Sequence, residues 1–226
     1  MLNNKPSAVL FDLDGTIADT ALDLAATLNH LLITSGRNKI HHDLVRNMVG
    51  EGARALIIKG FEYNNEELTD QEVEVLHDEY INYYRSHIAD KTVLFPNVFI
   101  TLETLLRQNI PLAICTNKSI ELTHLLLKRL KIFDFFTVVT CGDSFAYKKP
   151  DPRHLITTCK LMKADPKQAV MVGDSINDIE AARRANMLSV GVSFGYTLTP
   201  INELSPNIII NHFNEFFDAL NKVKSI

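Results

Sequence analysis

Short apolar runs rich in β-branched residues recur along the chain, and helical patterns separate the later ones. Runs of this length and composition are typical of strands buried on both faces of a parallel sheet. They occupy residues 8–11, 110–115, 136–140, 169–172, 188–192 and 208–210. Because strand and helix alternate, the sequence predicts an α/β fold with a doubly wound, Rossmann-like parallel sheet.

One long stretch interrupts this alternation. Residues 20–90 carry helical patterns throughout and contain no run that is typical of a strand. A connection of that length between consecutive parallel strands is uncommon unless it forms a structure of its own. We therefore expect a helical cap subdomain over residues 20–91, inserted into an α/β core of residues 1–19 and 92–226, with hinges at 19–21 and 92–97.

Capping residues mark the starts of several predicted helical turns. Asp151-Pro152 and Asp165-Pro166 each place a capping side chain before a proline that suits the first helical position. Asn177, with Glu180 three residues later, resembles a capping box. These signals predict helical turns that begin near residues 152, 166 and 178.

The composition excludes several classes of protein. Hydrophobic residues make up 46% of the 226 residues and charged residues 22%, which excludes a disordered chain. The net charge of −4 argues against a nucleic-acid-binding protein, which would carry a basic stripe. No apolar run approaches the roughly 18 residues that span a bilayer, so we expect neither a membrane anchor nor a signal peptide. The three cysteines lack the spacing of a zinc or redox motif, so we expect reduced, packed thiols in a cytoplasmic protein.

Polar residues gather just after several of the predicted strands. Ligands of an open α/β sheet bind beyond the carboxyl ends of its strands, so these positions are candidates for a site. The candidates are Asp12, Asp14 and Thr16 after the first strand, Thr116, Asn117, Lys118 and Ser119 after the second, Asp174 and Asp178 after the fourth, and Lys148 and Lys149 before a helix. Such a set of acids, hydroxyls and lysines at one edge of a sheet indicates a catalytic site.

Asp12 and Asp14 lie two residues apart, so their side chains point to the same face while the backbone stays extended. Carboxylates so placed repel each other, and a hard cation relieves the repulsion. Mg²⁺ prefers oxygen ligands, with one or two carboxylates, waters and substrate phosphate. Asp174 supplies a third acid, so the sequence predicts a Mg²⁺ site. Taken alone, Asp14-Gly15 also suits an ordinary turn at the end of a strand.

Four short motifs resemble those of the haloacid dehalogenase-like phosphatase superfamily. They are Asp12-Leu13-Asp14-Gly15-Thr16, Thr116-Asn117, Lys149-Pro150 and Gly173-Asp174-Ser175-Ile176-Asn177-Asp178, and together they span nearly the whole chain. The predicted insertion after the first motif is similar to the helical cap of that superfamily. Residues 49–54 and 193–196 are similar to segments of phosphoglycolate phosphatases.

The resemblance implies roles for the acids of these motifs. Asp12 is expected to be the nucleophile, because phosphoryl transfer to a carboxylate divides hydrolysis into two easier steps. Asp14 is expected to be the general acid and base, and a metal ligand through its backbone carbonyl. Asp12 and Asp174 are expected to bind Mg²⁺ directly, and Asp178 to orient ligands or waters around it.

The resemblance also implies that Thr116, Asn117 and Lys149 hold the phosphoryl group and offset its charge. Lys148 competes with Lys149, which the family pattern favours because it immediately precedes the proline. Asn117 could equally cap the helix that follows it. Lys118 is interpreted as a surface or cap-facing residue.

Arg54 is a candidate for substrate specificity. It follows Gly50 and Gly52, which suit a loop that approaches a substrate closely, and its planar guanidinium matches a carboxylate bidentately. The alternative is an ordinary surface arginine on a cap helix.

The expected function is that of a Mg²⁺-dependent phosphomonoesterase that hydrolyses 2-phosphoglycolate to glycolate and phosphate through an aspartyl-phosphate. Its partner would be a small phosphorylated metabolite, with no nucleic acid and no membrane. The alternatives are the same chemistry on a sugar phosphate or N-acetylmuramate 6-phosphate, and, at a greater distance, a phosphoacceptor signalling module. The sequence leaves the oligomeric state open.

Overall fold

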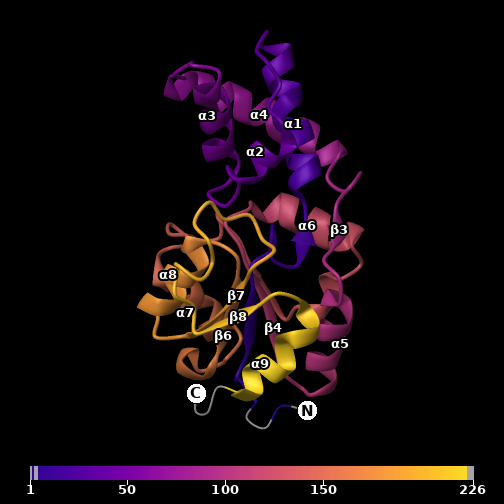
Figure 1. Cartoon of the computed structure of the whole chain (residues 1–226), viewed down its shortest axis with the longest axis vertical. Coiled ribbons are helices and arrows are strands. Elements are labelled where there is room, and N and C mark those ends of the chain that lie inside the picture. Colours follow the sequence, from indigo (N-terminus) through magenta and orange to yellow (C-terminus); the bar gives the residue numbers. More distant parts are fainter. Residues whose placement is uncertain (1, 3–4, 223–226) are drawn as a thin grey trace.

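The centre of the molecule is a six-stranded sheet whose neighbouring strands all run parallel (Figure 1). The computed structural model describes residues 2 and 5–222. The strands are β1 Val9–Phe11, β4 Leu112–Cys115, β5 Val138–Thr140, β6 Val170–Gly173, β7 Leu188–Val192 and β8 Ile208–Ile210. All six lie where the sequence predicts them, with ends that differ by no more than two residues.

The strand order β5-β4-β1-β6-β7-β8 puts β1 in the middle of the sheet. From β1 the chain builds outward through β4 and β5 on one side, then returns and builds outward from β6 on the other. This reversal opens a crevice at the carboxyl ends of β4, β1 and β6, where open α/β sheets bind their ligands. The candidate residues after these strands are therefore brought to one place.

Helices cover both faces of the sheet, as a doubly wound fold requires (Figure 1). Successive residues of β1 point to opposite faces, so Val9 and Phe11 belong to one apolar cluster and Leu10 to the other. The first cluster includes side chains of α5, α6 and α9, and the second those of α7 and α8. These helices are α5 Val98–Arg107, α6 Ile120–Arg129, α7 Pro152–Leu161, α8 Ile176–Arg184 and α9 Phe216–Lys222.

The stretch between the first two strands of the sheet forms a helical insert beyond its carboxyl end (Figure 1). Its helices are α1 Ala21–Thr34, α2 His42–Arg46, α3 Ala53–Tyr63 and α4 Asp70–Ser86. Thr69 and Glu72 form a capping box that begins α4. Leu28 of α1, Phe61 of α3 and Tyr80 of α4 are buried between these helices, in an apolar cluster continuous with that of the core.

The chain leaves and re-enters the core through a short antiparallel ladder, in which β2 Ala18–Asp19 pairs with β3 Val93–Leu94. The buried Asp23 carboxylate accepts hydrogen bonds from the Thr92 backbone N–H at 2.8 Å and the Thr92 hydroxyl at 2.7 Å. The ladder was not predicted, because two residues are too few to display the alternation of a strand.

Two predicted helix starts agree with the structure and one does not. Asp151 caps α7 by accepting from the Arg153 backbone N–H, and Asp165 begins a 3₁₀ turn in the same way. The prediction at Asn177 is wrong: Ser175 caps α8 and forms a capping box with Asp178. The capping pattern occurs in two overlapping frames here, and spacing alone does not choose between them. The 3₁₀ turns are Phe133–Phe135, Pro166–Gln168 and Phe213–Glu215.

The structure also bears on expectations drawn from composition. Cys115, Cys141 and Cys159 are free thiols, and all three are buried. Over the described part of the chain, every helix is too short or too polar to cross a membrane.

Candidate active site

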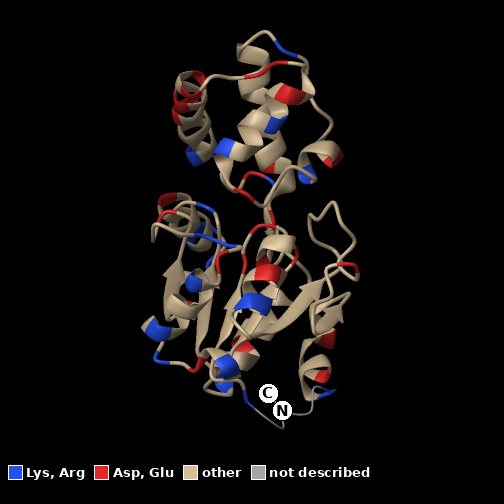
Figure 2. Ribbon diagram, turned by 90° about the vertical axis from the view of Figure 1, so that its left-hand side faces the viewer, with Lys and Arg blue, Asp and Glu red and all other residues tan. Residues whose placement is uncertain are grey.

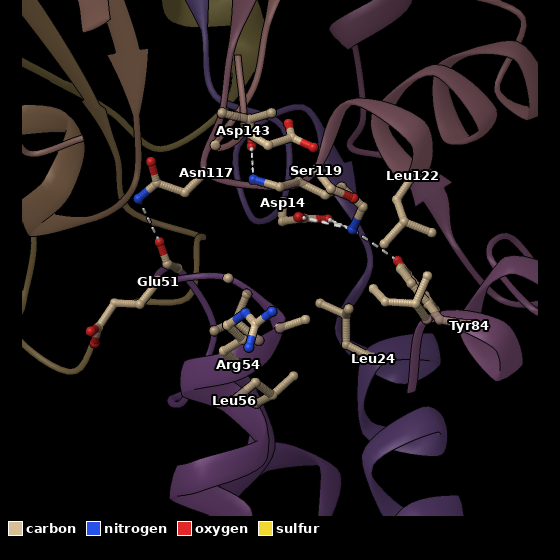
Figure 3. Close-up of a pocket in the computed structure, with 18 of the residues that line it drawn as sticks. Asp14, Leu24, Glu51, Arg54, Leu56, Tyr84, Asn117, Ser119, Leu122 and Asp143 are labelled. Atoms are coloured by element: carbon tan, nitrogen blue, oxygen red, sulfur yellow. Dashed lines mark hydrogen bonds and ion pairs between the residues drawn. The ribbon is translucent and has the colours of Figure 1, made fainter. Parts of the chain in front are cut away.

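A cavity of about 310 Å³ lies between the carboxyl edge of the sheet and the helical insert. Asp14 and Asn117 of the core line one side, while Arg54 and Leu56 of α3 line the other (Figure 3). Charged residues of both signs meet at this junction (Figure 2). The cavity is thus built jointly by the core and the insert.

Asp12 follows β1 directly and lines the cavity. Its backbone N–H donates to the Val172 carbonyl at 2.9 Å. This bond extends the pairing of β1 with β6 by one residue and fixes the position of the Asp12 backbone. Burial raises the pKa of Asp12 to about 6, although the Lys149 ammonium, 2.8 Å from Oδ1, opposes the shift. A carboxylate so placed is available for attack and is strongly desolvated.

Lys149 is the lysine that reaches Asp12. Its Nζ lies 2.8 Å from Asp12 Oδ1 and 2.6 Å from Asp178 Oδ1, and the side chain is buried. Burial opposes the charged form, but the two carboxylates outweigh it and raise the pKa of Lys149 above its usual range. Lys148 instead points to the insert, where its Nζ donates to the Glu51 carbonyl at 2.9 Å.

Asp174 is held at the end of β6 by two donors. The Thr16 hydroxyl lies 2.8 Å from Oδ1, and the Tyr196 backbone N–H lies 2.7 Å from Oδ2. Gly15 has a φ of +85°, and a Cβ there would lie 2.5 Å from Asp174 Oδ2. Only glycine therefore allows the turn that brings Thr16 to Asp174. Burial, followed by repulsion from Asp178 and Asp12, raises the pKa of Asp174 to about 8.

Asp12, Asp174 and Asp178 offer three carboxylate oxygens within 4.8 Å of one another. Lys149 is the one ammonium bonded to this group among the described residues, so the three acids carry excess negative charge. Asp178 is already engaged, since Lys149 and Ser175 occupy its two oxygens. Asp174 accepts only from neutral donors, and each of its oxygens has a second lone pair, so Asp12 and Asp174 can still bind a cation; this hard oxygen set fits a divalent ion such as Mg²⁺.

We expect Mg²⁺ to raise the melting temperature of the protein, because an ion that binds only the folded state stabilises it. Asp174→Asn should remove most of this rise, since it deletes one of the two carboxylates that are expected to hold the ion. Asp43→Asn is the matched control, because Asp43 belongs to an exposed group with His41 and His42. Thermal melting with and without Mg²⁺ measures the effect, and an undiminished rise in Asp174→Asn would place the ion elsewhere.

Thr116 and Asn117 follow β4 and have different environments. The Thr116 backbone N–H donates to the Thr140 carbonyl at 3.0 Å, and its hydroxyl is buried at the cavity wall. The side-chain amide of Asn117 donates to the carbonyls of Gly50 at 3.2 Å and Lys149 at 3.0 Å. Asn117 therefore ties the insert to the core. Its interpretation as a helix cap is wrong, because Ser119 precedes α6.

Asp14 also lines the cavity, but its carboxylate is not part of the group formed by Asp12, Asp174 and Asp178. It accepts hydrogen bonds from Lys118 instead. The Lys118 Nζ lies 3.1 Å from each carboxylate oxygen of Asp14 and 3.1 Å from the Tyr84 hydroxyl. Lys118 does face the cap helix, but its interpretation as a surface residue is wrong, since only 5% of its side chain is exposed. The partner that buries it, Tyr84, is 34 residues away in the sequence.

Arg54 lies in the first turn of α3, at the wall of the cavity. About half of its side chain is exposed, and its guanidinium forms an ion pair with Glu74, with Nη2 at 2.8 Å from Oε2. The guanidinium thus lies beside the cavity with one partner already. Its proposed contact with substrate stays a prediction.

Several contacts between the insert and the core were missed by sequence reasoning. The Asn177 side-chain amide donates to the Gly50 carbonyl at 3.2 Å, as Asn117 does. Arg46 donates to the Phe194 carbonyl at 2.6 Å, and its guanidinium stacks over the Tyr196 ring. These contacts join segments as far apart in the sequence as Arg46 and Tyr196, so no local pattern could have indicated them.

The model of one sequence family, described as haloacid dehalogenase-like hydrolase, matches residues 9–192. The chain belongs to the haloacid dehalogenase-like hydrolases. The resemblance that the four motifs indicate is therefore confirmed, and the match includes the whole helical insert and every strand of the sheet except β8.

Similar members of this family carry phosphatase names. The chain is 41% identical to a phosphoglycolate phosphatase of Agrobacterium fabrum, over 93% of this chain and 91% of that one. It is 36% identical to a phosphoglycolate phosphatase of Psychrobacter arcticus, over 95% of each. The crystal structure of a predicted phosphoglycolate phosphatase of Haemophilus somnus is 31% identical and superposes with a TM-score of 0.91, over 96% of this chain and 98% of that one. The predicted fold is thereby confirmed.

Proposed function

We propose that this hydrolase is a Mg²⁺-dependent phosphomonoesterase that converts 2-phosphoglycolate to glycolate and phosphate through an aspartyl-phosphate on Asp12. The observation that carries the proposal is the placement of Asp12 and Asp14 on the wall of one cavity, which the helical insert closes. The names of its relatives support the enzyme class, a phosphoric monoester hydrolase, and the substrate.

In the first half-reaction, a carboxylate oxygen of Asp12 attacks phosphorus while the bond from phosphorus to the ester oxygen breaks. Asp14 supplies the proton that the departing glycolate oxygen needs. Attack by a carboxylate requires no prior deprotonation, unlike attack by a hydroxyl. Lys149, 2.8 Å from Asp12 Oδ1, keeps the nucleophile in place.

In the second half-reaction, a water attacks the phosphorus of the aspartyl-phosphate, and the bond between phosphorus and the Asp12 oxygen breaks. Asp14, which lost its proton in the first step, accepts a proton from this water. One residue thus serves as acid and then as base, and the enzyme returns to its starting state with phosphate released.

The phosphoryl oxygens are held by Thr116, Asn117 and Lys149. Thr116 lines the cavity, and Lys149 has a third ammonium proton beyond those given to Asp12 and Asp178. The Asn117 amide is occupied by two carbonyls, so its contribution is assigned to the backbone N–H. These donors act on the charge of a loose phosphoryl transition state.

Mg²⁺ would be held by the carboxylates of Asp12 and Asp174 and by the backbone carbonyl of Asp14. When bound, it supplies a positive charge that polarises the phosphoryl group and offsets repulsion between phosphate and carboxylate. Asp178 contributes indirectly, by orienting Lys149.

The insert, residues 20–91, acts as a cap over the site. In the structure its Gly50 carbonyl accepts hydrogen bonds from Asn117, which follows β4, and from Asn177, in the first turn of α8. Lys148 adds a third contact, to the Glu51 carbonyl. Such closure excludes bulk water from the reaction.

The test of the proposed function is phosphate release with Mg²⁺ across a panel of phosphate esters. We expect the highest kcat/KM for 2-phosphoglycolate, and no release after Mg²⁺ is removed with a chelator. The comparison esters are sugar phosphates and N-acetylmuramate 6-phosphate, which have larger leaving groups. A preference for either would overturn the substrate and keep the chemistry.

The same assay, with p-nitrophenyl phosphate added to the panel, tests whether Arg54 contacts the substrate. If its guanidinium reaches the substrate carboxylate, Arg54→Ala raises KM for 2-phosphoglycolate and leaves KM for p-nitrophenyl phosphate, which has no carboxylate, nearly unchanged. Glu74→Ala is the matched control, because it removes the ion-pair partner and frees the guanidinium. An unchanged KM in Arg54→Ala would remove Arg54 from the site.

A further inference from the structure

Lys118 connects a helix of the insert to Asp14 across the wall of the cavity. Its Nζ lies 3.1 Å from both oxygens of the Asp14 carboxylate and 3.1 Å from the hydroxyl of Tyr84. Lys118 comes from the loop after β4. Asp14 comes from the loop after β1, and Tyr84 from α4 of the insert (Figure 3). All three residues line the cavity.

The hydrogen-bond donors of Lys118 match the acceptors of Asp14 and Tyr84 in number. A lysine ammonium has three donors, and here two carboxylate oxygens and one hydroxyl oxygen accept them. Burial, followed by the carboxylates of Asp14 and Asp23, raises the pKa of Tyr84 well above its usual range, so its hydroxyl stays neutral. The Lys118 Nζ also lies 4.6 Å from the centre of the Tyr84 ring, a cation–π distance.

This arrangement restricts the Asp14 side chain. With both oxygens bonded to one ammonium, the carboxylate has a defined rotation, which a single hydrogen bond would not impose. The ammonium is itself fixed by Tyr84, which is fully buried and carried by the insert. If the insert moved away from the core, Lys118 would lose the acceptor that Tyr84 provides.

We propose that Lys118 is a positioning residue that orients the Asp14 carboxylate, and that Tyr84 makes this orientation depend on closure of the insert. The proposal rests on the assignment of Asp14 as general acid and base. Both Asp14 oxygens accept from Lys118 in this arrangement, which is the form that takes a proton from the attacking water; as the acid, Asp14 carries a proton on one oxygen and keeps the bond from Lys118 to the other. It follows that proton transfer by Asp14 is efficient only when the insert covers the site.

The test uses the leaving group to separate proton transfer from other effects. Glycolate leaves as a basic alkoxide that needs a proton, whereas p-nitrophenolate leaves readily without one. We expect Lys118→Met to lower kcat for 2-phosphoglycolate by about 10- to 100-fold, which is part of the roughly 10²- to 10⁴-fold that general acid–base catalysis contributes, because Asp14 itself remains. Release of p-nitrophenolate in the first turnover, followed by stopped flow with enzyme in excess, should change less than about twofold.

Tyr84→Phe tests the link to the insert without removing a buried charge. We expect it to lower kcat for 2-phosphoglycolate by about fivefold, as for the loss of one hydrogen bond, with KM unchanged. Tyr83→Phe is the matched control. It removes a hydroxyl from the neighbouring position of α4, on a ring that is stacked between His30 and His87.

Three results would overturn the proposal: an equal loss on both substrates in Lys118→Met, a rise in KM alone, or a Tyr84→Phe variant as active as wild type. If Lys118→Met does not fold, the test is the comparison of kcat between Tyr84→Phe and its control Tyr83→Phe. Failure of wild type to hydrolyse 2-phosphoglycolate would instead refute the proposed substrate. The comparison would then use the best alkyl phosphate of the panel.

Discussion

Asp12→Asn is expected to lower kcat for 2-phosphoglycolate by about 10⁴-fold or more, the scale of loss seen when a covalent nucleophile is removed. The asparagine side chain has nearly the shape of aspartate but lacks the charge that attacks phosphorus. Its carbonyl oxygen can still accept from Lys149, which lies 2.8 Å from Asp12 Oδ1 in wild type. Phosphate release under saturating substrate and Mg²⁺ measures the loss.

The fold of Asp12→Asn should be intact, and without Mg²⁺ its melting temperature should equal or exceed that of wild type. We expect this melting temperature because the substitution removes one of three buried acidic side chains that repel one another. Asp143→Asn is the matched control, since Asp143 is another acid of the cavity wall, whose carboxylate accepts from the Ile120 backbone N–H. Substantial turnover by Asp12→Asn would refute the covalent mechanism.

The central strands of the sheet were predictable because they are buried on both faces. A strand such as Val9–Phe11 must be apolar at every position, so it stands out from its surroundings without any knowledge of its neighbours. The strand ends then locate the site, because parallel strands present their carboxyl ends at a common edge. Asp12 and Asp174 follow from this rule alone, and the structure brings them together.

The features that were missed depend on contacts between distant segments. Lys118 is followed by a helix and has the local pattern of a surface residue, and only its contact with Tyr84 of the insert explains its burial. Asn117 and Asn177 both donate to Gly50, a glycine of the insert with a φ of +122°. A sequence contains no local signal for such contacts, because they form only when the insert meets the core.

Lys149→Met is expected to destabilise the folded protein by about 3–5 kcal/mol when a chelator is present, as found when one partner of a buried ion pair is removed. Lys149 is 2% exposed and bonds to both Asp12 and Asp178, so methionine would leave these two buried carboxylates without their ammonium. Urea unfolding at neutral pH measures the change. Lys148→Met is the matched control, because this neighbouring lysine is bonded to a carbonyl and not to a carboxylate, and we expect a change within about 0.5 kcal/mol.

A double variant separates the loss of an ion pair from the loss of packing. Lys149→Met combined with Asp178→Asn removes the ammonium together with one carboxylate, so we expect it to be more stable than Lys149→Met alone. Mg²⁺ should also restore part of the stability of Lys149→Met, because a cation bound by Asp12 and Asp174 offsets the same repulsion. If the double variant were no more stable than Lys149→Met, packing rather than charge would explain why this lysine is buried among acids.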